Sequence, residues 1–170
     1  ANISCTNALL TKTKETTAFL KDLNEQISKD DTANLYVIHG TPRLDTVGID
    51  SISYSASFLE LISENNFTCS LEGAFPYFEI NDVIKSRIEK LGLKKVQVVP
   101  LLLVSGNHYI EDMFEIKDDL SDKFESFIVP SLTKSEKFNL IELPMIQNII
   151  EKNIQNTFKM MGISHKEITY

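Results

Sequence analysis

Cysteine is scarce in this chain. Its 170 residues contain only Cys5 and Cys69, and these two form no C-x-x-C motif. A small protein held together by disulfides needs a regular set of cysteines, so that class is excluded. Two free thiols are typical of a reducing compartment, and we therefore expect a cytoplasmic protein.

Positive charge is also scarce. The chain has 17 lysines and arginines against 24 aspartates and glutamates, a net charge of −7. Binding to nucleic acid needs a basic face, so a nucleic-acid partner is not expected. No apolar run approaches the ~20 residues of a membrane helix, and we expect no membrane partner. Residues 1–5 do not form a signal peptide, which leaves a removed peptide or a fragment of a longer protein as alternatives.

What is present is an alternation of apolar strand patterns and amphipathic helix patterns. We expect one α/β domain over residues 1–170, a three-layer sandwich around a parallel sheet of four to five strands. Strands are predicted near 35–38, 67–71, 96–104 and 124–129, of which 67–71 is expected to be only partly covered, with a short strand or extended lead-in at 137–142. Helices are predicted near 8–29, 51–65, 79–91, 109–123 and 144–161. Thr11 or Thr13 would cap the first helix, and Gly92 would end the third.

Three side chains that can bind metal follow three of these strands. They are His39, Glu72 and His108, and each has a glycine within two residues. Parallel strands bring their carboxyl ends to one edge of the sheet, where α/β proteins bind ligands. Two imidazoles and a carboxylate suit zinc, cobalt, nickel or ferrous iron, and the imidazoles could also accept protons.

Simpler interpretations of the same residues stay open. A histidine after a strand can serve only to hydrogen-bond its loop, and Glu72 could pair with Arg43. The glycines could be ordinary turn residues. The acidic run of 111–119 is either a solvated helix face or an approach route for a cation. The third histidine, His165, lies in the tail and is expected to be exposed.

Three motifs give the chain a resemblance to a known family. The motifs are Ile38-His39-Gly40-Thr41, Leu71-Glu72-Gly73-Ala74-Phe75-Pro76 and the stretch from Pro100 through Ser105-Gly106-Asn107-His108 to Asp112-Met113. In this order they resemble motifs of the anaerobic cobaltochelatases, which insert cobalt into sirohydrochlorin or precorrin-2 during cobalamin synthesis. The Ala8-Leu9-Leu10 entry also resembles the family's segment before a linking helix, here residues 8–30.

The resemblance implies a lyase of the chelatase type with a flavodoxin- or chelatase-like fold. It implies that His39 and His108 are catalytic and that both, together with Glu72, bind the divalent metal, with cobalt ahead of nickel or iron. The tetrapyrrole substrate would contact neighbouring positions, which are Gly40, Thr41, Gly73, Phe75, Gly106 and Tyr109. Family enzymes hold the macrocycle between two lobes, and this chain resembles the C-terminal one. It would therefore need a missing N-terminal lobe or a homodimer partner.

Other functions remain open. The second hypothesis is a non-catalytic module that binds metal or tetrapyrrole on the same fold. Arg43 replaces a family histidine and Asn107 replaces a family aspartate, and such departures favour a third hypothesis, a lobe kept only as a dimerisation or scaffold domain. A flavodoxin-like signalling or flavin domain ranks below these.

Overall fold

Strands and helices alternate along the chain as the sequence pattern predicts. A computed structural model describes residues 5–6, 9–41, 43, 49–103 and 107–162, without the side chains of Ile49, Asn107 and His108. The elements are α1 (Thr13–Ile27), β1 (Thr32–Gly40), α2 (Ile49–Ile62), β2 (Asn66–Glu72), α3 (Tyr77–Lys90), β3 (Lys95–Leu101), α4 (Asn107–Leu120), β4 (Glu125–Ile128), the 3₁₀ helix η1 (Leu140–Glu142) and α5 (Pro144–Met160). Across these residues no helix is both long enough and apolar enough to cross a membrane.

The four strands form one parallel sheet in the order β2-β1-β3-β4. The central strand β1 pairs with β2 on one side and with β3 on the other, in registers that include Gly40↔Glu72 and Ile38↔Leu101. Parallel neighbours need crossover connections, which α2, α3 and α4 supply. The α/β class and the parallel sheet are thus confirmed, and the described residues contain four strands, the lower of the two expected numbers.

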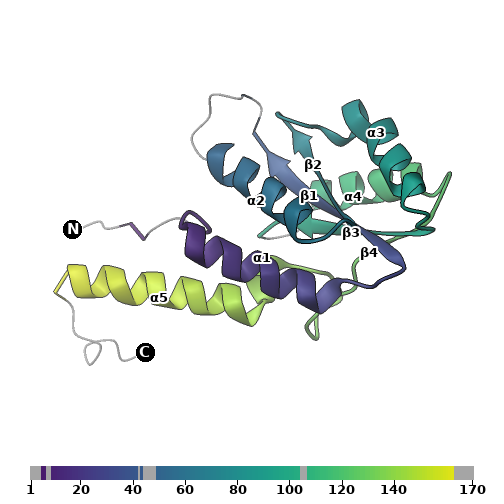
Figure 1. Cartoon of the computed structure of the whole chain (residues 1–170). Helices are drawn as coiled ribbons and strands as arrows, with labels where there is room; N and C mark the ends of the chain where they lie inside the picture. The colour runs from purple at the N-terminus through teal and green to yellow at the C-terminus, as the bar shows by residue number, and fades with distance from the viewer. Residues whose placement is uncertain (1–4, 7–8, 42, 44–48, 104–106, 163–170) are drawn as a thin grey trace.

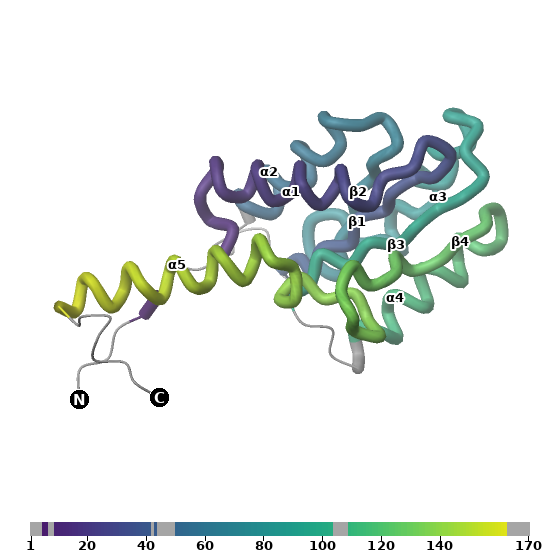
Figure 2. The backbone as a smooth tube through the Cα atoms, turned by 90° about the horizontal axis from the view of Figure 1, so that it is seen from below, coloured from purple at the N-terminus to yellow at the C-terminus, as the bar shows by residue number. Residues whose placement is uncertain are grey.

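Helices cover both faces of the sheet, which gives the predicted three layers (Figure 1). One core lies between the sheet and the α3/α4 pair and includes Val37, Val98, Ile84 and Ile116. The other lies under α1, α2 and the start of α5 and includes Tyr36, Phe19, Leu59 and Ile146. The rest of α5 runs out past the sheet on the side of α1 (Figure 2). Both cysteines are free thiols, Cys5 exposed and Cys69 buried.

A row of buried amides crosses the sheet near its amino-terminal edge. Asn66, Asn34 and Gln97 stand in register on β2, β1 and β3, each at most 1% exposed. Asn34 donates from Nδ2 to Asn66 Oδ1 (2.8 Å), and Gln97 donates from Nε2 to Asn34 Oδ1 (2.5 Å). The same amides also donate to the carbonyls of Ile27 and Leu59, at 2.8 Å each. Because an unpaired buried amide costs roughly 1–3 kcal/mol, this row fixes the strand register and ties α1 and α2 to the sheet.

The end of β3 differs from the prediction. The apolar run predicts a strand to about residue 104, but β3 ends at Leu101, and 104–106 lie outside the described residues. Of the two alternatives for 137–142, the short strand is wrong, because Leu140–Glu142 form η1, whereas Asn139 before it is extended. The backbone N–H of Leu140 donates to the carbonyl of Leu102 (3.3 Å). The backbone just beyond β3 is thus hydrogen-bonded to a single turn of 3₁₀ helix rather than to a strand.

The first helix also begins later than predicted. Its N-cap residue is Lys12, and no side chain caps it, so the predicted threonine cap is wrong. Leu10 has a positive φ of 54°, a conformation that a helix cannot include. The predicted end of α3 is confirmed, because Gly92 follows the helix with a φ of +73° and donates its N–H to the Glu89 carbonyl (2.9 Å).

Candidate metal and substrate site

His39 is the penultimate residue of the central strand. Side chains alternate along a strand, so His39 shares the face of Val37 and points to the α3/α4 side. Its Nδ1 lies 3.1 Å from the Gly40 carbonyl oxygen, and its Nε2 lies 2.6 Å from the Tyr109 hydroxyl. A carbonyl can only accept, so Nδ1 carries the proton of the neutral ring and Nε2 carries its lone pair. The nitrogen that can bind a metal is therefore Nε2.

Glu72 is the last residue of β2 and lines the same pocket as His39. The pocket has a volume of about 300 Å³. Its other described lining residues are Ser70 and Leu71 from β2, Tyr77 and Phe78 from α3, and Tyr109, Asp112, Glu115 and Ile116 from α4. None of the described lining residues is a lysine or arginine, so the pocket favours a cation. Asp112 and Glu115 thus face a pocket as well as solvent.

The third predicted ligand is only partly placed. His108 belongs to the first turn of α4, which follows β3, but its side chain and Gly106 lie outside the described residues. Within the described part of the chain, no group of three or more His, Cys, Asp or Glu side chains is arranged to hold a metal ion. The structure therefore brings His39 and Glu72 to one pocket, and the role of His108 stays a prediction.

Two glycines allow the ends of β1 and β2 beside this pocket to approach each other closely. Gly40 and Gly73 have φ values of +81° and +85°. A Cβ on Gly40 would lie 1.9 Å from the Glu72 carbonyl oxygen, and a Cβ on Gly73 would lie 1.9 Å from the Thr41 carbonyl oxygen. The Glu72 backbone thus occupies the space that a side chain on residue 40 would need, and the Thr41 backbone occupies the space that a side chain on residue 73 would need. The glycines shape the site through this contact, and their predicted contact with substrate stays a prediction.

Of the three other predicted substrate positions, Thr41 and Phe75 lie beside the pocket. The Thr41 hydroxyl donates to the Arg43 carbonyl (2.9 Å), and the backbone of Phe75 is hydrogen-bonded to Ser70. Neither Thr41 nor Phe75 is among the described residues that line this pocket. Tyr109 does line it, and its hydroxyl contacts His39.

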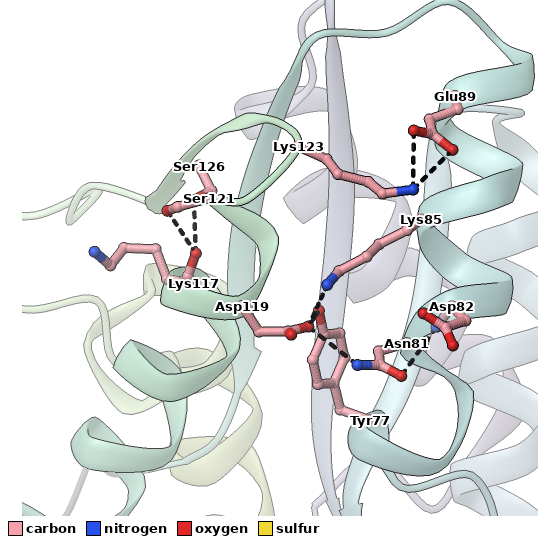
Figure 3. A network of polar contacts seen from close by, with 10 residues as sticks. All are labelled: Tyr77, Asn81, Asp82, Lys85, Glu89, Lys117, Asp119, Ser121, Lys123 and Ser126. Atoms are coloured by element: carbon pink, nitrogen blue, oxygen red, sulfur yellow. Dashed lines mark hydrogen bonds and ion pairs between the residues drawn. The ribbon is translucent and has the colours of Figure 1, made fainter.

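A polar network behind the pocket joins α3 to α4 (Figure 3). Asp119 Oδ2 accepts from Lys85 Nζ (2.8 Å), from the Tyr77 hydroxyl (2.7 Å) and from Asn81 Nδ2 (3.2 Å). Burial alone would raise the pKa of Asp119, but these three hydrogen bonds outweigh it, and its pKa lies below the ordinary 3.8. Burial, and then the bond to Asp119, raises the pKa of Tyr77.

The sequence analysis did not predict this network, although the spacing of residues on α3 indicates it. Tyr77, Asn81, Lys85 and Glu89 recur every four residues, which puts them on one side of α3. Lys85 lies among the apolar residues of an amphipathic helix, and a lysine there needs an acidic partner. The partner, Asp119, belonged to a run predicted to be a solvated helix face or a cation route.

Solved structures share this arrangement of strands and helices. The chain is similar to a provisionally assigned cobalamin (vitamin B12) biosynthesis CbiX protein from Marinobacter aquaeolei VT8, with a TM-score of 0.56 and 18% identity over 76% of this chain and 98% of that one. It is also similar to DR2241 from Deinococcus radiodurans, a multi-domain protein with structural similarity to chelatases, with a TM-score of 0.53 and 13% identity. That match covers 82% of this chain and 28% of the other. The fold is therefore of the chelatase type.

A comparison of the sequence with models of known protein families assigns the family. The sequence model of the family described as "Cobalt chelatase (CbiK)" matches residues 4–159. The chain belongs to this cobalt chelatase family, which confirms the resemblance seen in its three motifs. A search of curated protein sequences finds no significant match. Family membership places the chain among metal chelatases that act on tetrapyrroles.

Proposed function

We propose that the protein inserts cobalt(II) into sirohydrochlorin or precorrin-2, as a step of anaerobic cobalamin synthesis. The observation that carries this proposal is that His39 and Glu72 line one pocket whose other ionisable residues include Asp112 and Glu115. Imidazole and carboxylate with open positions suit a first-row divalent ion that must later be released. Nickel and ferrous iron would accept the same donors, and the test below compares them.

Insertion requires the macrocycle to lose two pyrrole N–H protons while it gains one divalent ion. His39 Nε2 has one lone pair, because Nδ1 carries its proton toward the Gly40 carbonyl. It can therefore hold either the ion or a proton, and release of the ion leaves it able to accept the first proton. Glu72 can take the second, because its exposed carboxylate can pass the proton on to water. In this proposal His108 supplies a further ligand.

The tetrapyrrole needs a second wall, and we propose that another lobe or a second copy of the chain provides it. The chain forms a single α/β lobe and spans 28% of the multi-domain DR2241. The far half of α5 leaves the body and exposes Ile154 (40%) and Met160 (89%), as a docking surface would. Sedimentation velocity checks the partner: a chain that stays monomeric and still turns over alone would contradict this proposal.

The metal role of His39 and Glu72 is tested by cobalt titration calorimetry. The wild-type chain is expected to bind about one ion, His39→Ala to bind it at least ~100-fold more weakly, and Glu72→Gln about tenfold more weakly. His165→Ala is the matched control, because it removes a histidine of the tail and should leave the affinity unchanged. Wild-type affinity in His39→Ala would contradict the proposal.

Turnover distinguishes the enzyme from a binding module. With sirohydrochlorin and cobalt in excess, a chelatase changes the absorbance of many macrocycles per chain. A module that only binds metal or tetrapyrrole changes at most one. Repeating the assay with nickel and ferrous iron identifies the preferred ion.

A further inference from the structure

The lone pair that His39 would offer to a metal is already occupied. The Tyr109 hydroxyl lies 2.6 Å from Nε2, which is the length of a good hydrogen bond. With Nδ1 bonded to the Gly40 carbonyl, Nε2 can only accept, so Tyr109 is the donor. A metal ion and this hydroxyl need the same lone pair and exclude one another.

Tyr109 stands between two pockets. On one side is the acidic pocket of His39 and Glu72, and on the other is a pocket of about 400 Å³. This second pocket is lined mainly by apolar side chains, including Met113, Phe114 and Phe138. The Tyr109 ring therefore has room to turn away from His39 without a shift of α4.

We propose that Tyr109 is an internal competitor of the metal ion, a latch that closes on His39 Nε2 in the empty site and opens when an ion binds. The proposal rests on the metal role of His39. The latch keeps the imidazole oriented while no ion is present. After the ion has passed to the macrocycle and Nε2 has handed on the pyrrole proton, the hydroxyl returns to Nε2 and restores the starting hydrogen bond.

The orientation of His39 does not depend on the latch alone. Its Nδ1 is held by the Gly40 carbonyl, and its ring meets that of Tyr109 edge-on, with centroids 4.9 Å apart and an interplanar angle of 73°. A phenylalanine at this position keeps the ring contact and loses only the competing hydroxyl. A merely structural hydroxyl would therefore leave metal affinity unchanged or reduced when removed, whereas a competitor would increase it.

Tyr109→Phe is the test, with cobalt(II) alone as the titrant. We expect this variant to bind cobalt about threefold to tenfold more tightly than the wild type, which is the factor that one net hydrogen bond supplies. Tyr54→Phe is the matched control, because its hydroxyl bonds Thr17 between α1 and α2 and lines neither pocket. It should bind like the wild type, and circular dichroism checks that all variants are folded.

The outcomes separate the latch from the metal site. Loss of binding in His39→Ala together with tighter binding in Tyr109→Phe supports both. Loss in His39→Ala with equal or weaker binding in Tyr109→Phe overturns the latch and leaves the metal site intact. Unchanged binding in His39→Ala overturns the metal role of His39, and the latch with it.

Discussion

Gly40→Ala is expected to destabilise the protein by about 3–5 kcal/mol, although only one methyl group is added. The methyl group would lie 1.9 Å from the Glu72 carbonyl oxygen and 3.0 Å from Ser70 Cβ. Backbone cannot move aside as the end of a long side chain can, so the two loops must separate. A φ of +81° adds the cost that an L-residue incurs in the left-handed region.

Gly92→Ala is the matched control for this change. Gly92 also has a positive φ, +73°, but a Cβ there would meet no atom within 4 Å. It should therefore cost only the backbone term, about 1 kcal/mol. Urea unfolding followed by circular dichroism measures both variants. Equal losses in the two would show that the Glu72 backbone does not lie as close to Gly40 as described.

Gly40→Ala should also affect the binding of metal at the site. Separation of the loops would displace the Glu72 backbone from its register with Gly40. Cobalt affinity should then fall even under conditions in which Gly40→Ala is fully folded.

The fold could be read from the sequence because its two inner strands contain apolar runs. Burial of both faces makes β1 and β3 mainly apolar, as Val96, Val98 and Val99 show in β3, and the buried amides Asn34 and Gln97 that interrupt them are paired with one another. The prediction was wrong where backbone pairing, rather than apolarity, decides the structure. The run after Leu101 is as apolar as the strand itself, but its hydrogen-bond partner is a single turn of 3₁₀ helix.

The site could be predicted only in outline. The topology of a parallel sheet brings His39 and Glu72 to one edge, and this was visible from the order of strands and polar residues. The contact between His39 and Tyr109 depends on where α4 begins and how it is turned, which no spacing rule specifies. The close approach of Glu72 to Gly40 and of Thr41 to Gly73 could not be predicted for a similar reason, because a glycine in the sequence does not reveal which backbone passes beside it.

The second large effect is expected at the ion pair behind the site. Asp119→Asn should destabilise the protein by about 3 kcal/mol or more, because it leaves the Lys85 charge without its partner. The Lys85 side chain is only 8% exposed, and its Nζ lies 2.8 Å from Asp119 Oδ2. Lys85→Met should cost less, because Asp119 keeps the hydrogen bonds from Tyr77 and Asn81 and is 26% exposed.

A double-mutant cycle isolates the pair from the residues around it. Lys85→Met/Asp119→Asn should be more stable than Asp119→Asn alone, since the double variant no longer buries an unpaired charge. The control is Asp31→Asn, which breaks the exposed pair with Lys95 and should leave the unfolding midpoint close to that of the wild type. Additive losses in the cycle would mean that Lys85 and Asp119 do not interact in solution.

Acid gives an independent check on the same carboxylate. The pKa of Asp119 is lowered in the folded protein, so its charge stabilises the fold above its ordinary pKa of 3.8, and this contribution is lost as the pH falls through the lower folded value. Asparagine cannot titrate, so the stability difference between the wild type and Asp119→Asn should be largest at pH 5 and above. It should shrink as the pH is lowered below 3.8, because a protonated Asp119 resembles an asparagine toward Lys85. A difference that stays constant from pH 5 to pH 3 would assign the loss to the changed shape of the side chain rather than to its charge.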